Sequence, residues 1–348
     1  MENAKETNDN LNEHDIYHQI TPDLKINKII NGMWQVAGGH GKIDQDLAIK
    51  DMIKYHEYGF TSWDLADIYG PAEDFVGKFR DSLSDLKGVK ELEKIQAFTK
   101  WVPRPEKITR ILVKENLQRS LYRMKTNSLD LIQFHWWEYN IPYYMDAIRY
   151  LFELLDDGLV KQIGLTNFDT EHVQIIKDAG YNILSNQIQF SIIDRRPEVN
   201  MIPFCLNNKI NIFAYGTLCG GFVSEKYLGK LKEPSIYELN TLSLKKYKKM
   251  IDEWGGWTLF QELLCVLKTI ADKYEVSIAN IATKYILSKP AVSGVIIGTR
   301  LGIVDHIKDN SQIYKINLDK QDHEVIDTVC KKSNNLFNRI GDCGDEYR

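Results

Sequence analysis

The sequence carries four side chains of reactive types at or just after the ends of short apolar runs: a carboxylate, a phenol, an amine and an imidazole. They are Asp64, Tyr69, Lys100 and His135. A tyrosine is a poor acid at neutral pH, but a close ammonium such as that of Lys100 favours its phenolate and makes proton donation easier. Asp64 could pair with the ammonium, while a neutral imidazole at His135 could donate a hydrogen bond to an oxygen that gains negative charge. The set suits protonation or deprotonation of a carbonyl or alcohol oxygen.

The set lacks an evident nucleophile or electron source, so a hydride-carrying cofactor is the natural missing part. Taken singly, each member is better explained by structure, because an Asp-Lys pair is more often a structural ion pair and a strand histidine is more often a core residue. Four such residues at separate strand ends reverse that preference. Their function then depends on the elements that bring them together.

Short β-branched or apolar runs alternate with amphipathic helical stretches along the chain, which is typical of parallel strands joined by crossover helices. The expected strands are Lys28 to Trp34, Phe60 to Asp64, Ile95 to Lys100, Leu129 to His135, Val160 to Leu165, Ile183 to Ile188, Ile210 to Ala214 and Gly294 to Ile297. These strand-helix units predict an α/β fold, a (β/α)8 TIM barrel with its chemistry in the loops after the strands. An open doubly wound sheet is the alternative, but the sequence has no Gly-x-Gly-x-x-Gly run after its first strand.

The 348 residues allow two domains or one large barrel, and the strand count favours one barrel. We expect a polar N-terminal tail over residues 1–22, the barrel over 23–332 and a C-terminal extension over 333–348. Helix starts are expected at the N-caps Asp169, Ser277 and Asp319. Residues 216–257 depart from the strand-helix rhythm, which predicts a long loop after the seventh strand.

Composition excludes several classes of protein. The formal charge of -4, from 44 Lys+Arg and 48 Asp+Glu, offers no basic surplus for nucleic acid. No apolar stretch approaches the ~18 residues of a membrane helix, and the start of the chain does not resemble a secretion signal. The five cysteines are scattered, which favours free thiols without a metal site. We therefore expect a cytoplasmic protein with no membrane or nucleic-acid partner.

The candidate residues lie in three motifs: Trp63-Asp64-Leu65-Ala66-Asp67-Ile68-Tyr69-Gly70 with Glu73, Thr99-Lys100, and Phe134-His135-Trp136. These motifs resemble those of the aldo-keto reductases. The resemblance extends from about Ile26 to Ile316. It implies that Tyr69 is the general acid, Lys100 its activator, Asp64 the partner of the lysine, and His135 the residue that orients the carbonyl.

The same resemblance implies residues for a nicotinamide cofactor. Thr166 and Asn167, in Gly-Leu-Thr-Asn-Phe, would hold the carboxamide together with Gln187, and Tyr215 would stack on the nicotinamide ring. The segment after Tyr215 would fold over the pyrophosphate. Its residues here are Gly216 and Leu218.

The segment after the last strand resembles the adenosine-phosphate loop of the family. Its candidate residues are Gly298, Thr299, Arg300, His306 and Asn310. A basic residue beside a helix N-terminus suits a phosphate. His306 stands where many members have arginine, which leaves Arg300 as the main candidate for the 2'-phosphate and Asn310 for adenine. NADPH is therefore the expected cofactor, with NADH less favoured.

Tryptophans near the strand ends suggest an aromatic-walled pocket for an apolar or aromatic carbonyl compound or a sugar. We assign Trp34, Trp101 and Trp136 to it, and Trp137 to packing. Lysines 245, 246, 248 and 249 are interpreted as a solvated helical face.

The main hypothesis is an NADPH-dependent reductase of small aldehydes or ketones. One alternative is an NADP(H)-binding redox-sensing or regulatory subunit with slow turnover. Another is a barrel enzyme that uses Lys100 as a Schiff base, or paired carboxylates for hydrolysis.

Overall fold

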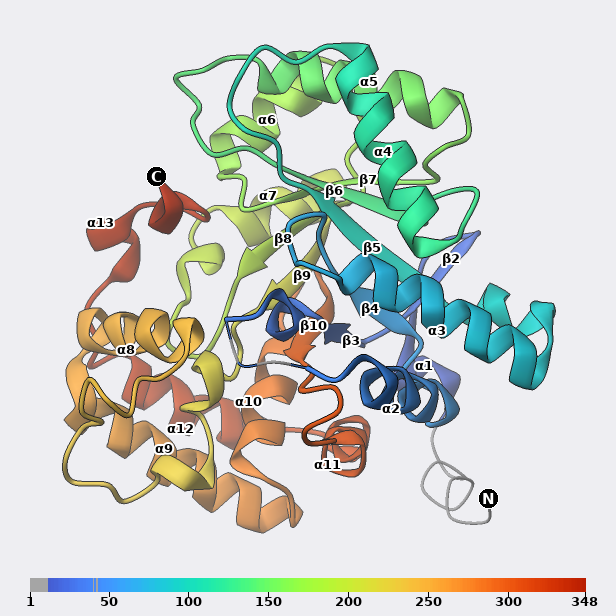
Figure 1. Cartoon of the computed structure of the whole chain (residues 1–348). Coiled ribbons are helices and arrows are strands. Elements are labelled where there is room, and N and C mark those ends of the chain that lie inside the picture. Colours follow the sequence, from blue (N-terminus) through green and yellow to red (C-terminus); the bar gives the residue numbers. More distant parts are fainter. Residues whose placement is uncertain (1–11, 40, 42) are drawn as a thin grey trace.

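A computed structural model describes residues 12–39, 41 and 43–348 of the chain. Parallel strands close into a barrel in the order β10-β3-β4-β5-β6-β7-β8-β9, with helices around it (Figure 1). The strands are β3 (Ile29–Gly32), β4 (Ser62–Asp64), β5 (Gln96–Trp101), β6 (Leu131–His135), β7 (Ile163–Thr166), β8 (Ser185–Gln189), β9 (Asn211–Tyr215) and β10 (Val292–Gly298). Each overlaps one of the expected strands, so the (β/α)8 prediction is confirmed.

Helices follow the barrel strands and cover their outer faces. Those after β3 to β8 are α2 (Gln45–Glu57), α3 (Ala72–Lys87), α4 (Arg110–Met124), α5 (Tyr144–Asp156), α6 (Thr170–Asp178) and α7 (Met201–Asn208). Those later in the chain are α8 (Leu242–Trp254), α9 (Gly256–Tyr274), α10 (Ile278–Leu287), α11 (Ile307–Ser311), α12 (Lys320–Cys330) and α13 (Leu336–Ile340). The expected N-caps Asp169, Ser277 and Asp319 each accept a backbone N–H in the first turn of α6, α10 and α12.

The interior of the barrel is layered by the two-residue period of its strands. Phe98 of β5 and Phe213 of β9 stack across the lower interior with ring centroids 5.9 Å apart. Two residues later along the strands come polar side chains, including Lys100 on β5 and Tyr215 on β9. The apolar layer therefore supports a polar layer at the carboxyl ends of the strands.

A hairpin of β1 (Tyr17–Thr21) and β2 (Leu24–Asn27) follows the short helix α1 (Glu13–Ile16) and precedes the barrel. The Asn27 side chain donates to the carbonyl of Gly59, just before β4. The described part of the expected tail, from residue 12, thus forms α1 and the first strand of the hairpin. Residues 1–11 lie outside the described part.

The long segment after β9 contains the 13-residue helix α8 as well as short 3-10 turns, so it is more regular than the expected loop. The expected extension forms α13 and a last turn, Asp345–Tyr347, which returns toward the barrel (Figure 1). In the described ranges, no helix has the length and apolar character needed to cross a membrane.

Candidate active site

A buried ion pair lies at the centre of the polar layer. The Lys100 Nζ atom is 2.6 Å from Oδ2 of Asp64, and it also donates to the carbonyl of Leu65 at 3.0 Å. Two amide groups, from Gln133 and Gln187, donate to the other Asp64 oxygen at 2.9 and 2.6 Å. The carboxylate therefore has three polar partners, which holds the lysine ammonium in one place.

Tyr69 lies in the turn after β4, with its ring centroid 5.1 Å from Nζ of Lys100. Burial raises the pKa of its phenol well above the usual value, and the negative charge of Asp64 adds to that increase. Burial also lowers the pKa of Lys100, while Asp64 opposes that change. Because burial and the negative charge of Asp64 both raise this pKa, the Tyr69 phenol keeps its proton at neutral pH. The effect that we expected from Lys100, a shift of Tyr69 toward the phenolate, is thus outweighed before reaction.

His135 ends β6, with Nδ1 3.1 Å from the carbonyl oxygen of Thr166. A carbonyl only accepts hydrogen bonds, so we assign the proton of the neutral ring to Nδ1. Burial lowers the pKa of His135 to about 4, which keeps the ring neutral at pH 7. Its Nε2 atom is buried and has no partner among the described residues. In this tautomer Nε2 is an acceptor, which differs from the donor that we expected.

The low pKa of His135 predicts a pH-dependent contribution to stability. Between about pH 4 and 6.5 the unfolded chain binds this proton more strongly, so stability falls as pH decreases through that window, by up to about 3 kcal/mol. Urea unfolding of wild type and His135→Asn at about pH 7 and about pH 4.5 measures the effect. We expect the variant to lose less stability on acidification, and equal losses would contradict the assignment.

The aromatic walls beside these residues differ from those expected. Trp34 packs edge-on against Tyr69 with centroids 4.9 Å apart, and Trp137 packs edge-on against His135 at 4.3 Å. Trp101 and Trp136 are buried outside the barrel, with centroids 5.3 and 6.0 Å from Phe134. Their assignment to the pocket is therefore corrected. Alternation explains the correction, because residues one position from Lys100 and His135 point outward.

The residues expected at the nicotinamide carboxamide form a second cluster beside His135. The Tyr215 hydroxyl donates to Oδ1 of Asn167 at 2.8 Å, and the Thr166 hydroxyl donates to the Gln187 carbonyl at 3.2 Å. Asn167 has a positive φ of 58°, a conformation that asparagine tolerates better than most residues. The structure thus brings Thr166, Asn167 and Tyr215 together, but it directs the Gln187 side-chain nitrogen to Asp64 and Gln133.

The turn after β9 is closely packed. Gly216 has φ of 81°, and a Cβ there would lie 2.4 Å from the Tyr247 hydroxyl, so a side chain would clash. Thr217 is buried, and its hydroxyl has no partner among the described residues. Leu218 is half-buried in the same turn. Sequence reasoning missed Thr217, although its place directly after Gly216 at a strand end was a usable signal.

The segment after β10 lies beside the end of β3. Both the backbone N–H and the hydroxyl of Thr299 donate to the carbonyl of Gly32, at 2.8 and 2.9 Å, so this hydroxyl has a structural partner. Gly298 ends β10. Arg300 and His306 are exposed, whereas Asn310 is buried in α11. The residues expected at the adenosine end thus lie in one loop and its following helix.

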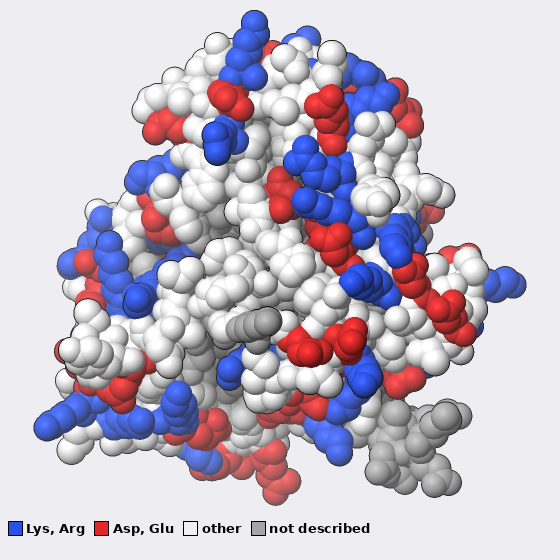
Figure 2. Space-filling view, viewed as in Figure 1, with Lys and Arg blue, Asp and Glu red and all other residues white. Residues whose placement is uncertain are grey.

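One face of the molecule has few charges near its centre. In the view of Figure 2, uncharged residues make up most of the centre, and Lys, Arg, Asp and Glu are mixed around it.

Comparisons with known proteins found relatives in sequence and in fold. Aldo-keto reductase YhdN of Bacillus subtilis is 25% identical over 319 residues, covering 89% of this chain and 92% of the relative. The NADH-specific methylglyoxal reductase of Escherichia coli is 23% identical over 326 residues, covering 87% of this chain and 94% of the relative. A crystal structure of an aldo-keto reductase from Klebsiella pneumoniae in complex with NADPH shares the fold, with a TM-score of 0.64 and 19% identity over 88% of this chain and 91% of that chain.

A family model describes most of the barrel. The model of the aldo/keto reductase family matches residues 28–331, from just before β3 to just after α12. The matched range includes Asp64, Tyr69, Lys100 and His135. On this evidence, the chain belongs to the aldo/keto reductase family.

Proposed function

We propose that this chain reduces an aldehyde or ketone to an alcohol with a nicotinamide cofactor, and that Tyr69 donates the proton. The observation that carries the proposal is the position of the Tyr69 phenol beside the buried Lys100–Asp64 pair, with its ring centroid 5.1 Å from the lysine ammonium. These groups can supply a proton to an oxygen and then stabilise the charge left behind.

The side chains around the mouth fit a nicotinamide cofactor. Asn167 and Thr166 offer an amide and a hydroxyl beside the Tyr215 ring, and the buried Thr217 hydroxyl lacks a partner among the described residues, as a phosphate-binding donor would. When bound, the reduced cofactor supplies the hydride that none of these side chains can supply. We assign Gln187 to the positioning of Asp64, because the Gln187 side-chain nitrogen already donates to that carboxylate.

The proton step uses three side chains. The carbonyl oxygen accepts a hydrogen bond from the Tyr69 hydroxyl, whose proton moves to that oxygen as the oxygen gains negative charge. The nearby Lys100 ammonium stabilises the resulting phenolate, and Asp64 holds the ammonium in place. The Trp34 and Trp137 rings pack edge-on against Tyr69 and His135 and so offer apolar surfaces beside them.

His135 acts differently in the two directions of the proposed reaction. Its unprotonated Nε2 accepts a hydrogen bond, so it suits the hydroxyl of an alcohol rather than a carbonyl oxygen. In the reducing direction it orients the product alcohol after proton transfer. In the oxidising direction it orients the substrate alcohol toward Tyr69.

We propose NADPH as the preferred cofactor, supported by the exposed guanidinium of Arg300, which forms no ion pair in the described part of the chain. Two of the three proteins named above differ in cofactor, since the Escherichia coli relative is described as NADH-specific and the Klebsiella pneumoniae structure is in complex with NADPH. The sequence expectation of NADPH therefore stays a prediction.

Replacing Arg300 tests this preference. Arg300→Leu should weaken NADPH binding by about tenfold and NADH binding by less than about twofold, because only NADPH carries the 2'-phosphate. Titration with quenching of tryptophan fluorescence gives both dissociation constants, and the exposed Lys315→Leu is the control for loss of one positive charge. Equal weakening of both cofactors would remove Arg300 from the phosphate site.

The activity itself is tested with purified chain, a panel of aldehydes and ketones, and either NADPH or NADH. Loss of the absorbance of the reduced nicotinamide, with formation of the matching alcohol, is the expected result. Tight cofactor binding without turnover of any carbonyl compound would contradict the proposal.

A further inference from the structure

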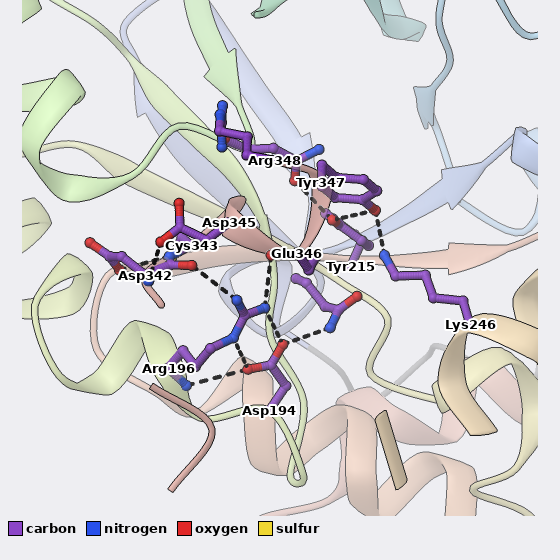
Figure 3. A network of polar contacts seen from close by, with 12 residues as sticks. Asp194, Arg196, Tyr215, Lys246, Asp342, Cys343, Asp345, Glu346, Tyr347 and Arg348 are labelled. Atoms are coloured by element: carbon purple, nitrogen blue, oxygen red, sulfur yellow. Dashed lines mark hydrogen bonds and ion pairs between the residues drawn. The ribbon is translucent and has the colours of Figure 1, made fainter. Parts of the chain in front are cut away.

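The last residues of the chain contact the ends of two barrel strands (Figure 3). The Arg348 guanidinium donates to the carbonyl oxygens of Trp136 and Asn167, at 3.0 and 2.9 Å. It also lies 3.9 Å from the ring centroid of Tyr139. Trp136 directly follows His135, and Asn167 directly follows Thr166, so the C-terminus contacts the segments that carry the candidate site.

A buried network of charges fixes this segment. Arg196 donates to both carboxylate oxygens of Asp194, at 2.8 Å each, to Glu346 at 2.9 Å and to the carbonyl of Asp342 at 2.9 Å (Figure 3). Gly344 packs so closely that a Cβ there would lie 2.1 Å from the Asn167 carbonyl oxygen. The C-terminal segment is therefore held as a built part of the barrel mouth.

This anchoring places Tyr347 between His135 and a lysine of α8. The Tyr347 ring lies edge-on to the His135 ring at 6.4 Å, and its hydroxyl is 3.0 Å from that of Tyr215. The Lys246 ammonium donates to the Tyr347 hydroxyl (Figure 3). It also lies 4.4, 5.3 and 5.5 Å from the ring centroids of Tyr347, Tyr215 and Tyr247.

The charge of Lys246 is not neutralised by a carboxylate in the described part of the chain. Lys248, two residues later on the same helix, pairs with Glu233 and Asp252. Lys246 instead has phenol and aromatic partners, which orient an ammonium without cancelling its charge. Our sequence-based assignment of these lysines to one solvated face therefore does not describe Lys246, which points toward the barrel mouth (Figure 3), or Lys248, which is buried and paired with two carboxylates.

A second cation adds to the positive potential near His135. Arg348, too, forms no ion pair with a carboxylate among the described residues. Burial is the main cause of the low pKa of His135, and the positive charges of Arg348 and Lys100 lower it further. An anionic group that enters this region would therefore meet positive charge and partly desolvated surroundings.

We propose that Lys246, oriented by Tyr347, binds an anionic group of the carbonyl substrate and so determines its specificity. The inference rests on the proposed function. The substrate would be a short aldehyde or ketone with a carboxylate or phosphate a few bonds from its carbonyl. The carbonyl would lie at Tyr69 and the anion at Lys246, with the Tyr347 ring between His135 and the ammonium.

Matched substrate pairs test this specificity at saturating cofactor. Succinic semialdehyde is compared with its methyl ester, and glyceraldehyde 3-phosphate with glyceraldehyde, so the two pairs distinguish a carboxylate from a phosphate. We expect wild type to favour the anionic member of at least one pair. The ratio of interest is kcat/KM for the anionic member divided by kcat/KM for the neutral member of the same pair. Lys246→Met should lower this ratio by about tenfold. Tyr347→Phe should lower it less, because the ammonium remains but loses one orienting partner.

The control removes the same charge one residue away. Lys245 is exposed on α8, and among the described residues the cation–π contacts to Tyr215, Tyr247 and Tyr347 from this helix come from Lys246, so Lys245→Met should leave the ratio unchanged. In wild type the ratio should also fall as ionic strength rises from about 0.05 to about 0.5 M, because salt screens an accessible charge pair. An equal loss for both members of a pair in Lys246→Met would mean that Lys246 only holds the C-terminal segment, and it would overturn the proposal.

Binding of an unreactive anion separates this inference from the proposed activity. Succinate should quench tryptophan fluorescence in the presence of cofactor, and Lys246→Met should weaken its binding by about tenfold. This result would support the anion site even if no carbonyl compound were reduced. Turnover of neutral aldehydes without any anion preference or succinate binding would leave the proposed function standing and refute the anion site.

Discussion

Replacing Tyr69 by phenylalanine is expected to lower kcat/KM for carbonyl reduction by about 10³-fold, the scale of a lost general acid. The substitution removes one hydroxyl and keeps the ring that packs against Trp34 at 4.9 Å. No other described phenol approaches the Lys100–Asp64 pair as Tyr69 does, with its ring centroid 5.1 Å from the ammonium. The measurement is steady-state reduction of an aldehyde at saturating cofactor.

The same variant should keep its fold and its cofactor affinity. Unfolding in urea and fluorescence titration with NADPH provide these two controls, and Tyr122→Phe, at a tyrosine that is 84% exposed, provides a matched substitution away from the site. If Tyr69→Phe reduces aldehydes as fast as wild type, the proton comes from another group. Loss of cofactor binding together with activity would instead place Tyr69 in the binding site rather than in proton transfer.

The barrel could be predicted from sequence because each of its strands has a recognisable local sequence pattern. On β5, Ala97 and Thr99 face the helices while Phe98 and Lys100 face the interior, and all four are buried. Such runs are read as strands even without a partner in view. Lys100 and His135 could then be selected as candidates, because the chemistry of such a barrel lies at the carboxyl ends of its strands.

The side chains that form the pocket walls were harder to predict, because a turn follows each strand end. His135 faces the interior, and two residues later Trp137 returns to its side, whereas Trp136 packs outside the barrel. Strict alternation from His135 would have selected Trp137. Gln187 shows a different limit, since its place on β8 was correct but its partner, Asp64, comes from a strand 123 residues earlier.

The C-terminal segment was beyond sequence reasoning for a physical reason. Glu346 and Arg196 are 150 residues apart, and Lys246 and Tyr347 are 101 apart, so no local period links them. Only the closed barrel brings these segments together. The residues in excess of a minimal barrel could be assigned to the N-terminus, the segment after β9 and the C-terminus. The contact between the last two of these segments could not be predicted.

Replacing Lys100 by methionine is expected to cost about 3–5 kcal/mol of stability, because it leaves the Asp64 carboxylate buried without its counterion. The two amides of Gln133 and Gln187 still donate to that carboxylate, but they carry no positive charge. Activity should fall as well, since the Tyr69 phenolate would form without a nearby cation. Urea unfolding and kcat/KM measure the two effects separately.

The double variant Asp64→Asn/Lys100→Met separates stability from catalysis. It removes both charges, so we expect it to recover most of the lost stability while activity stays as low as in Lys100→Met. That divergence would show that Asp64 acts mainly by holding Lys100 and that the ammonium itself supports proton transfer. If instead the double variant were as unstable as the single one, the cost would come from lost packing around Lys100, and the ion pair would not be the source of the instability.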